Sequence, residues 1–169
     1  MASFDEIADA WWEIDRLTDE KPEGYKQKVD ELWWAWETVE KQMEDASPDS
    51  VTLLVSLGDA APTAEALVSL GAGPLWTLFF ENGIRMATPE GASLLDAVAA
   101  ASRRNEAFRS ALSSLWYESD YVPEAVSSSI PGMPRALDER PPSPTDPAQA
   151  KRRKARRPGR PPPTRRPFD

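Results

Sequence analysis

Three carboxylates at helical spacing are the residues of this sequence best suited to chemistry. Glu37, Glu40 and Glu44 follow one another at steps of three and four, which places them near one face of a helix. Carboxylates grouped in this way can form an acid–base pair or bind a metal, but di-iron sites in helical bundles also need histidine ligands. The sequence contains no histidine. We therefore interpret these side chains as a solvated helix face and predict no catalytic residue, no metal site and no cofactor.

The residue patterns of other enzyme classes are missing as well. The sequence has no Gly-x-Ser-x-Gly segment, and without histidine it lacks the usual base that activates a serine. It has no cysteine, which excludes thiolate chemistry and disulfides. The segment Gly71-Ala72-Gly73 is not followed by the lysine of a phosphate-binding loop, and no predicted strand precedes it. We expect that the protein is not an enzyme.

A dense run of basic residues near the C-terminal end is a candidate nucleic-acid site. Residues 1–120 contain 23 acidic and 9 basic side chains, whereas residues 151–169 contain 9 basic side chains and one acidic. Clustered positive charge binds phosphate backbones. Gly159-Arg160-Pro161 also resembles the centre of an AT-hook, although Pro158 stands where that motif has its first arginine. The alternatives are a solubilising end or a tail that folds back on the acidic body. The candidate contacts are Lys151, Arg152, Arg153, Lys154, Arg156, Arg157, Arg160, Arg165 and Arg166.

Two tryptophans are the best candidates for a protein-binding surface. Trp12 and Trp34 each lie one position, about 100° around a helix, from a tryptophan on a predicted apolar stripe. We favour the interpretation that they pack against each other or against a neighbouring helix, because tryptophan is rarely left wholly exposed. The alternative is a partner-binding patch, since tryptophan is enriched in interface hot spots.

The elements that must position these residues are predicted to be helices. Ser3-Phe4-Asp5-Glu6 matches a capping box, and apolar residues at steps of three and four follow it as far as Leu17. A second apolar stripe runs from Tyr25 to Met43 and includes Trp33 and Trp36. Residues 3–45 are therefore predicted to form an antiparallel helical hairpin. Further helices are predicted within residues 48–117, with starts at Ser47-Pro48, Thr88-Pro89 and Asn105 and a stop at Asn82-Gly83.

The break at Gly71-Ala72-Gly73-Pro74 is predicted to be a tight corner between two helices. Glycine reaches positive φ and ends a helix, and proline fits the first turn of the next one, where its missing N–H is not needed. Gly71, Gly73 and Pro74 are the predicted structural corner.

The fold class follows from these patterns. No segment alternates apolar and polar residues as a strand does, so we predict an all-α, compact bundle of six or seven helices. Periodicity stops near Tyr121, where proline and charge increase. The predicted organisation is an acidic helical domain at 1–120 and a disordered linker with a Pro/Arg-rich basic tail at 121–169. Without a signal peptide or an apolar run of about 20 residues, a cytoplasmic protein that does not contact membranes is expected.

Three blocks in a fixed order resemble a bacterial domain family of unknown function. They are Trp34-Ala35-Trp36-Glu37, then Gly71-Ala72-Gly73-Pro74-Leu75, then Phe108-Arg109-Ser110-Ala111-Leu112, which Trp116 follows. The family usually has an acidic residue after the second block, and Trp76 stands there in this chain. The resemblance supports the helical fold and implies no reaction.

The charge and the lack of a catalytic constellation favour an interaction protein. Our first hypothesis is a non-enzymatic helical module that binds a basic protein partner, as an immunity protein or an antitoxin does. The alternative is a nucleic-acid-associated protein that binds through the basic C-terminal tail. The oligomeric state is left open by the sequence.

Overall fold

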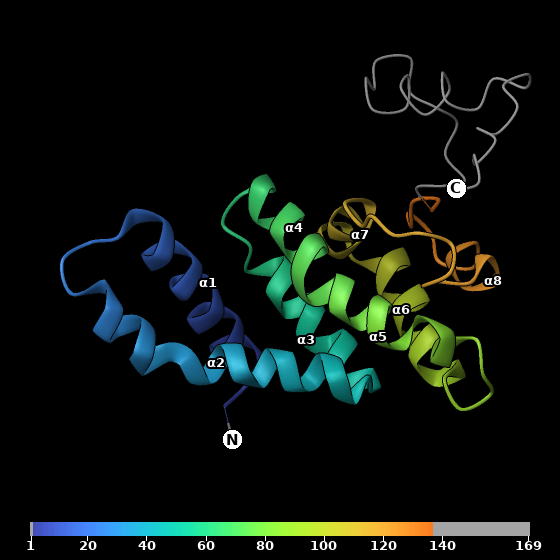
Figure 1. Ribbon diagram of the computed structural model, residues 1–169, viewed down its shortest axis with the longest axis horizontal. Helices are drawn as coiled ribbons and strands as arrows, with labels where there is room; N and C mark the ends of the chain where they lie inside the picture. The colour runs from blue at the N-terminus through green and yellow to red at the C-terminus, as the bar shows by residue number, and fades with distance from the viewer. Residues whose placement is uncertain (1, 137–169) are drawn as a thin grey trace, which may run out of the picture. The chain divides into compact units, whose positions relative to one another are not determined.

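The computed structural model describes residues 2–136, which belong to one compact unit, Met1–Glu139. Residue 1 and residues 137–169 lie outside the described part. The expected all-α fold is confirmed, because none of the described residues lies in a strand. In chain order the elements are α1 (Phe4–Glu20), α2 (Tyr25–Asp45), α3 (Pro48–Asp59), α4 (Ala64–Leu70), the π-helical turn η1 (Gly71–Leu75), α5 (Trp76–Met86), α6 (Ala92–Arg104), α7 (Glu106–Ser113) and α8 (Glu124–Ser127) (Figure 1).

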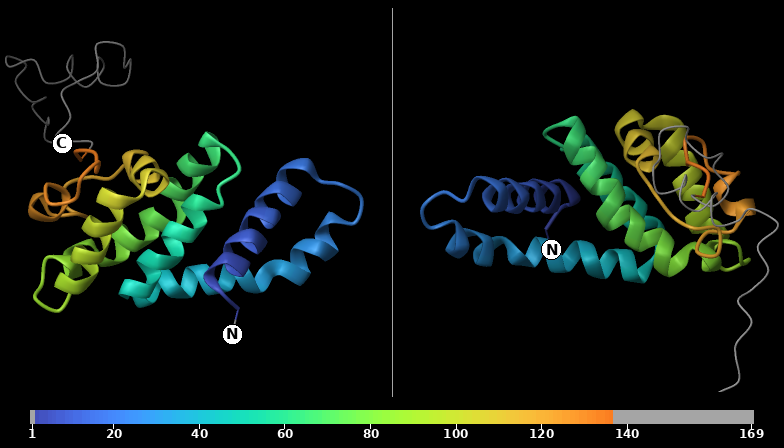
Figure 2. Two further views of the ribbon diagram at one scale, coloured as in Figure 1. Left: turned by 180° about the vertical axis from the view of Figure 1, so that it is seen from behind. Right: turned by 45° about the horizontal axis from the view of Figure 1, so that its top comes forward.

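The predicted N-terminal hairpin is confirmed. The Ser3 hydroxyl accepts the backbone N–H of Glu6 at 3.2 Å, and the Glu6 carboxylate accepts the Ser3 N–H at 2.7 Å, so both halves of the capping box form. α1 then buries the predicted stripe against α2 and α3. The turn that joins α1 to α2 extends away from the other helices (Figures 1 and 2). The outer half of α2 therefore has α1 as its neighbour on one side and solvent around the rest.

α3 lies at the centre of the bundle. It packs against α1, α2, α6 and α7, and its apolar residues face all of them. The predicted start is confirmed, because Ser47 precedes the helix and Pro48 occupies its first turn. Four of its apolar side chains are almost fully buried, namely Val51, Leu53, Leu54 and Leu57.

The predicted corner at Gly71, Gly73 and Pro74 is wrong. The chain passes from α4 through η1 into α5 with right-handed helical backbone angles at Leu70, Gly71 and Trp76. A π-helical turn is wider than an α-helical one and holds one residue more, which gives room for the proline ring inside a helix. Glycine is needed at position 71 because α7 comes very close to the backbone there, and not because the chain reverses its direction. A Cβ there would meet the Ala111 carbonyl oxygen of α7 at 2.5 Å.

Two further predicted boundaries are displaced. α5 continues past Asn82-Gly83 to Met86. The Asn82 amide donates to the Met43 carbonyl at 3.2 Å, and a Cβ at Gly83 would meet the Tyr121 carbonyl oxygen at 2.6 Å, so both residues serve contacts between elements. Thr88 precedes a turn, and α6 begins only at Ala92. The predicted start at Asn105 is confirmed, since its side chain accepts the Phe108 N–H at 2.7 Å.

The predicted domain boundary at residue 120 is also wrong, because the folded unit includes residues 121–136. The Tyr117 hydroxyl donates to the Pro134 carbonyl at 2.6 Å, and the Ser102 hydroxyl donates to the Pro131 carbonyl. This segment shows no periodicity because it is mostly irregular chain, in which single apolar residues fill separate positions on the helices. Its buried side chains are Val122, Val126, Ile130 and Ala136. The remainder of the predicted tail, 137–169, lies outside the described residues.

Among residues 2–136, no helix is both long enough and apolar enough to cross a membrane.

Candidate functional site

The two tryptophans singled out from the sequence occupy different environments. Trp12 is only 6% exposed, and its indole N–H donates to the Leu57 carbonyl at 2.8 Å. Leu57 belongs to the last turn of α3, where carbonyl groups have no partner within the helix. Trp12 therefore packs in the core and caps the end of α3, as the favoured interpretation holds.

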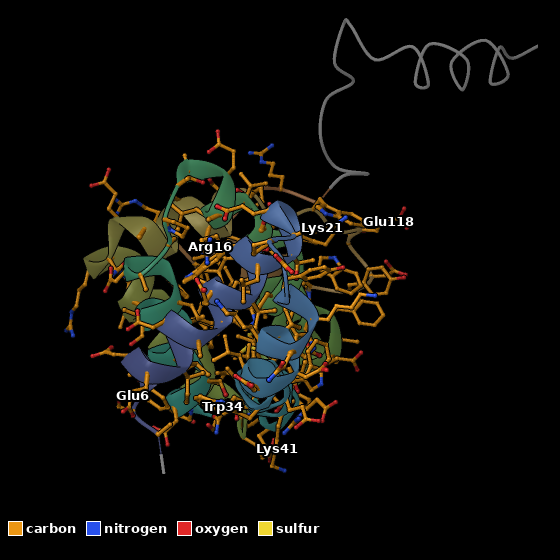
Figure 3. The ribbon with its side chains drawn as sticks, turned by 90° about the vertical axis from the view of Figure 1, so that its left-hand side faces the viewer. Glu6, Arg16, Lys21, Trp34, Lys41 and Glu118 are labelled. Atoms are coloured by element: carbon orange, nitrogen blue, oxygen red, sulfur yellow. The ribbon has the colours of Figure 1, made fainter. Side chains whose placement is uncertain are left out.

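Trp34 is 40% exposed on α2. Figure 3 places its side chain on the same side of the view as Lys41 and far from Glu118. Its backbone carbonyl accepts the Thr38 hydroxyl at 2.7 Å. Trp34 is therefore available to a partner, and its role as a contact stays a prediction.

Two tryptophans that the sequence assigns to the inner stripe of α2 are exposed instead. Trp33 is 44% exposed and Trp36 is 37% exposed. Their rings stack at a centroid distance of 5.7 Å, and Trp36 stacks on Trp11 of α1 at 6.0 Å. Trp11 in turn meets Trp12 edge to face at 4.5 Å. We call the exposed pair Trp33 and Trp36 the tryptophan face, which rests on the buried rings of α1.

The exposure of the tryptophan face has a simple cause in the fold. The half of α2 that follows the α1–α2 turn lies beside α1 and apart from the other helices (Figures 1 and 2), and the side chains buried on α2 are Ala35, Val39 and Met43. A helix with a single neighbour buries a narrow stripe, so the residues at its margins stay at the surface. A sequence pattern gives the width of the apolar stripe but not how many neighbours cover it. This is why sequence reasoning missed Trp33 and Trp36 as surface residues.

The surroundings of the tryptophan face are acidic. Trp36, Glu40 and Glu44 follow at steps of four on α2, so they share one side of that helix. Beyond Trp36 this side forms an open groove against α5, lined by Glu40, Glu44, Thr77, Glu81, Asn82 and Arg85. The Arg85 guanidinium donates to the Asn82 side-chain oxygen at 2.6 Å. Three carboxylates and one arginine in the groove leave it negative.

Charges on α1 are paired locally. Arg16 forms ion pairs with Glu13 at 2.7 Å and with Glu20, and these pairs lower the pKa of Glu13 and raise that of Arg16. Asp15 lies on the same helix, where partial burial and repulsion by Asp19 raise the pKa of its carboxyl group. These effects are those of a solvated helix surface.

Glu37, Glu40 and Glu44 are not assembled into a metal site. Within residues 2–136, no group of three or more acidic side chains is placed to hold a metal ion. The candidate nucleic-acid contacts, from Lys151 to Arg166, lie outside the described residues.

Comparison with known families decides where the chain belongs. A family model described as a family of unknown function, DUF6869, matches residues 20–129. The chain belongs to DUF6869. The expected resemblance to an uncharacterised domain family is thereby confirmed. The DUF6869 region starts at the last residue of α1 and continues through α8, so it contains the tryptophan face and part of the segment after residue 120. No curated protein and no solved structure was found to match the chain.

Proposed function

We propose that the protein is a non-enzymatic helical interaction module that binds a basic protein partner through the tryptophan face of α2. An immunity- or antitoxin-like role is one form of this function. The observation that carries the proposal is the exposure of Trp33 and Trp36 as a stacked pair beside the acidic groove. Aromatic anchors of this size dominate the binding energy of many interfaces.

The chemistry of the face favours a cationic partner. An arginine or lysine placed over an indole ring gains a cation–π interaction, and carboxylates close by add electrostatic complementarity. Glu40 and Glu44 lie on the side of α2 that carries Trp36, and Glu81 faces them across the groove. A basic helix or loop of the partner would therefore contact rings and carboxylates together.

Capture of the partner from native cell lysate, with variants of the full chain as bait, tests the proposal. The double variant Trp33→Ala/Trp36→Ala removes the face. Trp34→Ala is the matched control, because it removes an equally exposed tryptophan from another side of the same helix. We expect the wild type and Trp34→Ala to retain the same basic protein. The double variant should retain it at least about thirtyfold more weakly, since even one tryptophan that acts as a hot spot contributes about 2 kcal/mol or more.

Circular dichroism and urea unfolding establish that the double variant is folded. Equal retention of the partner by all three baits, or capture of an acidic protein through the face, would contradict the proposal. A partner lost only with Trp34→Ala would move the site to the Trp34 side of α2.

A second candidate function is nucleic-acid binding through the basic tail, and it rests on the nine basic residues within 151–169. Gel shifts with duplex DNA on the full chain and on residues 1–145 test it. The full chain should bind, with an affinity that falls by about 10³ between 50 and 200 mM salt if about six phosphates are contacted. The shortened chain should not bind. Equal binding by both chains, or by neither, removes this function.

A further inference from the structure

α5 carries an apolar row on its outward side. Trp76, Phe80 and Ile84 follow one another at steps of four, so they lie along one side of the helix. Ile84 is 63% exposed and Phe80 is 37% exposed. The rings of Trp76 and Phe80 stack at a centroid distance of 4.5 Å, which holds both side chains in place. We call these three residues the α5 ridge.

Two more aromatic side chains border the α5 ridge. Trp116 is 52% exposed, and its ring lies 5.9 Å from that of Trp76. Tyr121 is 38% exposed, and its ring lies 4.8 Å from that of Phe80. The Trp76 indole N–H donates to the Trp116 carbonyl at 3.1 Å, so the chain after α7 is fixed beside the ridge. Exposed apolar area on several adjoining side chains marks an interaction surface.

A polar row lies directly beside the α5 ridge. Thr77, Glu81 and Arg85 also follow at steps of four, each one position, about 100°, after a residue of the ridge. These residues line the acidic groove, together with Glu40 and Glu44 of α2. Of the six residues that line the groove, three are glutamates and one is an arginine. The outward side of α5 therefore presents an apolar row and, next to it, a negative groove.

The two rows match the two faces of an amphipathic helix. A helix that docks on a protein surface is anchored by apolar residues at i, i+3 or i+4, and i+7, and polar residues flank these anchors. The α5 ridge covers eight helical steps, or about 12 Å, and anchors at i and i+7 are about 10 Å apart. Cationic side chains beside the anchors would lie over the carboxylates of the groove.

Charge favours a basic helix over other occupants. An acidic helix would place its carboxylates against Glu40, Glu44 and Glu81, which is unfavourable. A second copy of this chain is disfavoured for the same reason, since residues 1–120 contain 23 acidic and 9 basic side chains.

We propose that the α5 ridge and the acidic groove together bind one amphipathic helix of a basic partner protein. The apolar side chains of this helix pack on Phe80, Ile84 and Trp116, and its lysines or arginines pair with the carboxylates of the groove. The identity of the partner rests on the proposed function, which takes it to be a basic protein. The contact then extends from the tryptophan face on α2 to the outward side of α5.

A synthetic amphipathic peptide tests this site with the purified full chain. The probe is a fluorescein-labelled helix of about five turns, made of lysine and leucine with all leucines on one side. Fluorescence anisotropy at low salt measures its dissociation constant. Ile84→Gln should weaken binding at least about tenfold, because it places a polar side chain at the most exposed position of the ridge. Trp34→Ala is the matched control and should change binding less than about twofold, since Trp34 lies outside the ridge and the groove.

The charge and the amphipathic form are tested separately. Glu40→Gln/Glu44→Gln/Glu81→Gln should weaken binding of the probe and reduce its dependence on salt concentration. A peptide of the same composition, with its leucines spread around the helix, should bind the wild type at least about tenfold more weakly. This comparison needs no variant, and circular dichroism shows whether the variants are folded. Equal binding of the two peptides to the wild type, or of the probe to the wild type and Ile84→Gln, overturns the proposal.

A double variant separates the α5 ridge from the tryptophan face. If Trp33→Ala/Trp36→Ala loses the probe and Ile84→Gln keeps it, the helix binds the tryptophan face alone, which contradicts the ridge and supports the proposed function. If only Ile84→Gln loses the probe, the ridge holds while the tryptophan face fails. Sedimentation velocity of the wild type without peptide should show a monomer. A dimer that Ile84→Gln dissociates would make a second copy the occupant and overturn the proposal.

Discussion

The tryptophans of α1 and α2 lie in different surroundings because each meets a different neighbour. Trp12 faces the end of α3 and donates to the Leu57 carbonyl. Trp33 and Trp36 lie at the margin of a helix that has one neighbour along its outer half. The surrounding elements therefore decide whether a tryptophan ring is buried in the core or exposed at the surface, and residue type alone does not.

Substitution of single tryptophans by phenylalanine separates these roles. Trp12→Phe should lower the free energy of unfolding by roughly 1–3 kcal/mol, because the buried Leu57 carbonyl loses its donor. Trp34→Phe should change it by less than about 0.5 kcal/mol, since the ring is at the surface. Urea unfolding measures both values. Equal losses would mean that Trp34 is packed in solution.

Two carboxyl groups on α1 should respond to pH in opposite directions. The pKa of Glu6 is lowered by the hydrogen bonds from the Ser3 N–H and hydroxyl. Its charged form therefore stabilises the fold above its unfolded pKa, and this contribution is lost as the pH falls through the folded value. The pKa of Asp15 is raised by burial and by Asp19, so its ionisation destabilises the fold above the folded pKa.

At about pH 7, Glu6→Gln should lower the urea midpoint and Asp15→Asn should raise it. Both differences should shrink at an acid pH below the folded pKa of each group, where the wild-type carboxyl groups are protonated in both states. Urea titrations of the three proteins at the two pH values measure this. A destabilising Asp15→Asn at neutral pH would contradict the assigned direction of the shift.

Among the elements, the helical run from α4 to α5 departs most from expectation. The two glycines of Gly71-Ala72-Gly73-Pro74 have different reasons to be there. A Cβ at Gly71 would meet the Ala111 oxygen at 2.5 Å and the Ser114 Cβ at 2.9 Å, whereas a Cβ at Gly73 would have nothing within 4 Å. Gly71 lets α7 approach the π-helical turn, and no contact requires glycine at position 73.

Alanine substitutions at the two glycines test this difference. Gly71→Ala should destabilise the protein by about 1–3 kcal/mol, because backbone atoms of α7 must move. Gly73→Ala should stabilise it by about 0.5–1 kcal/mol, since alanine is the better helix former and meets no neighbour. Thermal unfolding ranks the three proteins. A destabilised Gly73→Ala would instead favour the predicted tight corner at Gly71-Ala72-Gly73-Pro74.

The elements also define what the sequence can predict. The capping box at Ser3, the start at Pro48 and the cap at Asn105 are local signals, and all three hold in the structure. Gly71 contacts α7 and Asn82 contacts α2, and both helices lie far away in the sequence. A local pattern cannot identify such contacts, so it predicts a corner and a helix end where the structure has neither. The exposure of Trp33 was missed for the same reason, because its coverage depends on neighbours that periodicity does not identify.

At the scale of the whole molecule, the folded unit depends on a segment without a sequence pattern. Val122, Val126 and Ile130 are buried against the helices, and the Tyr117 hydroxyl bonds to Pro134. The DUF6869 match continues to residue 129 and so extends well past the end of α7. Residues 121–136 therefore act as a cover for one side of the helical bundle.

Truncation tests the importance of this cover. A chain that ends at residue 136 should unfold at nearly the temperature of the full chain, because every described contact is kept. A chain that ends at residue 120 should unfold at a clearly lower temperature, since it exposes core side chains and leaves the Ser102 and Tyr117 hydroxyls without Pro131 and Pro134. Tyr117→Phe in the full chain should lose only about 0.5–1.5 kcal/mol, the value of one hydrogen bond. Equal melting temperatures for the two shortened chains would place the true domain boundary before Tyr121.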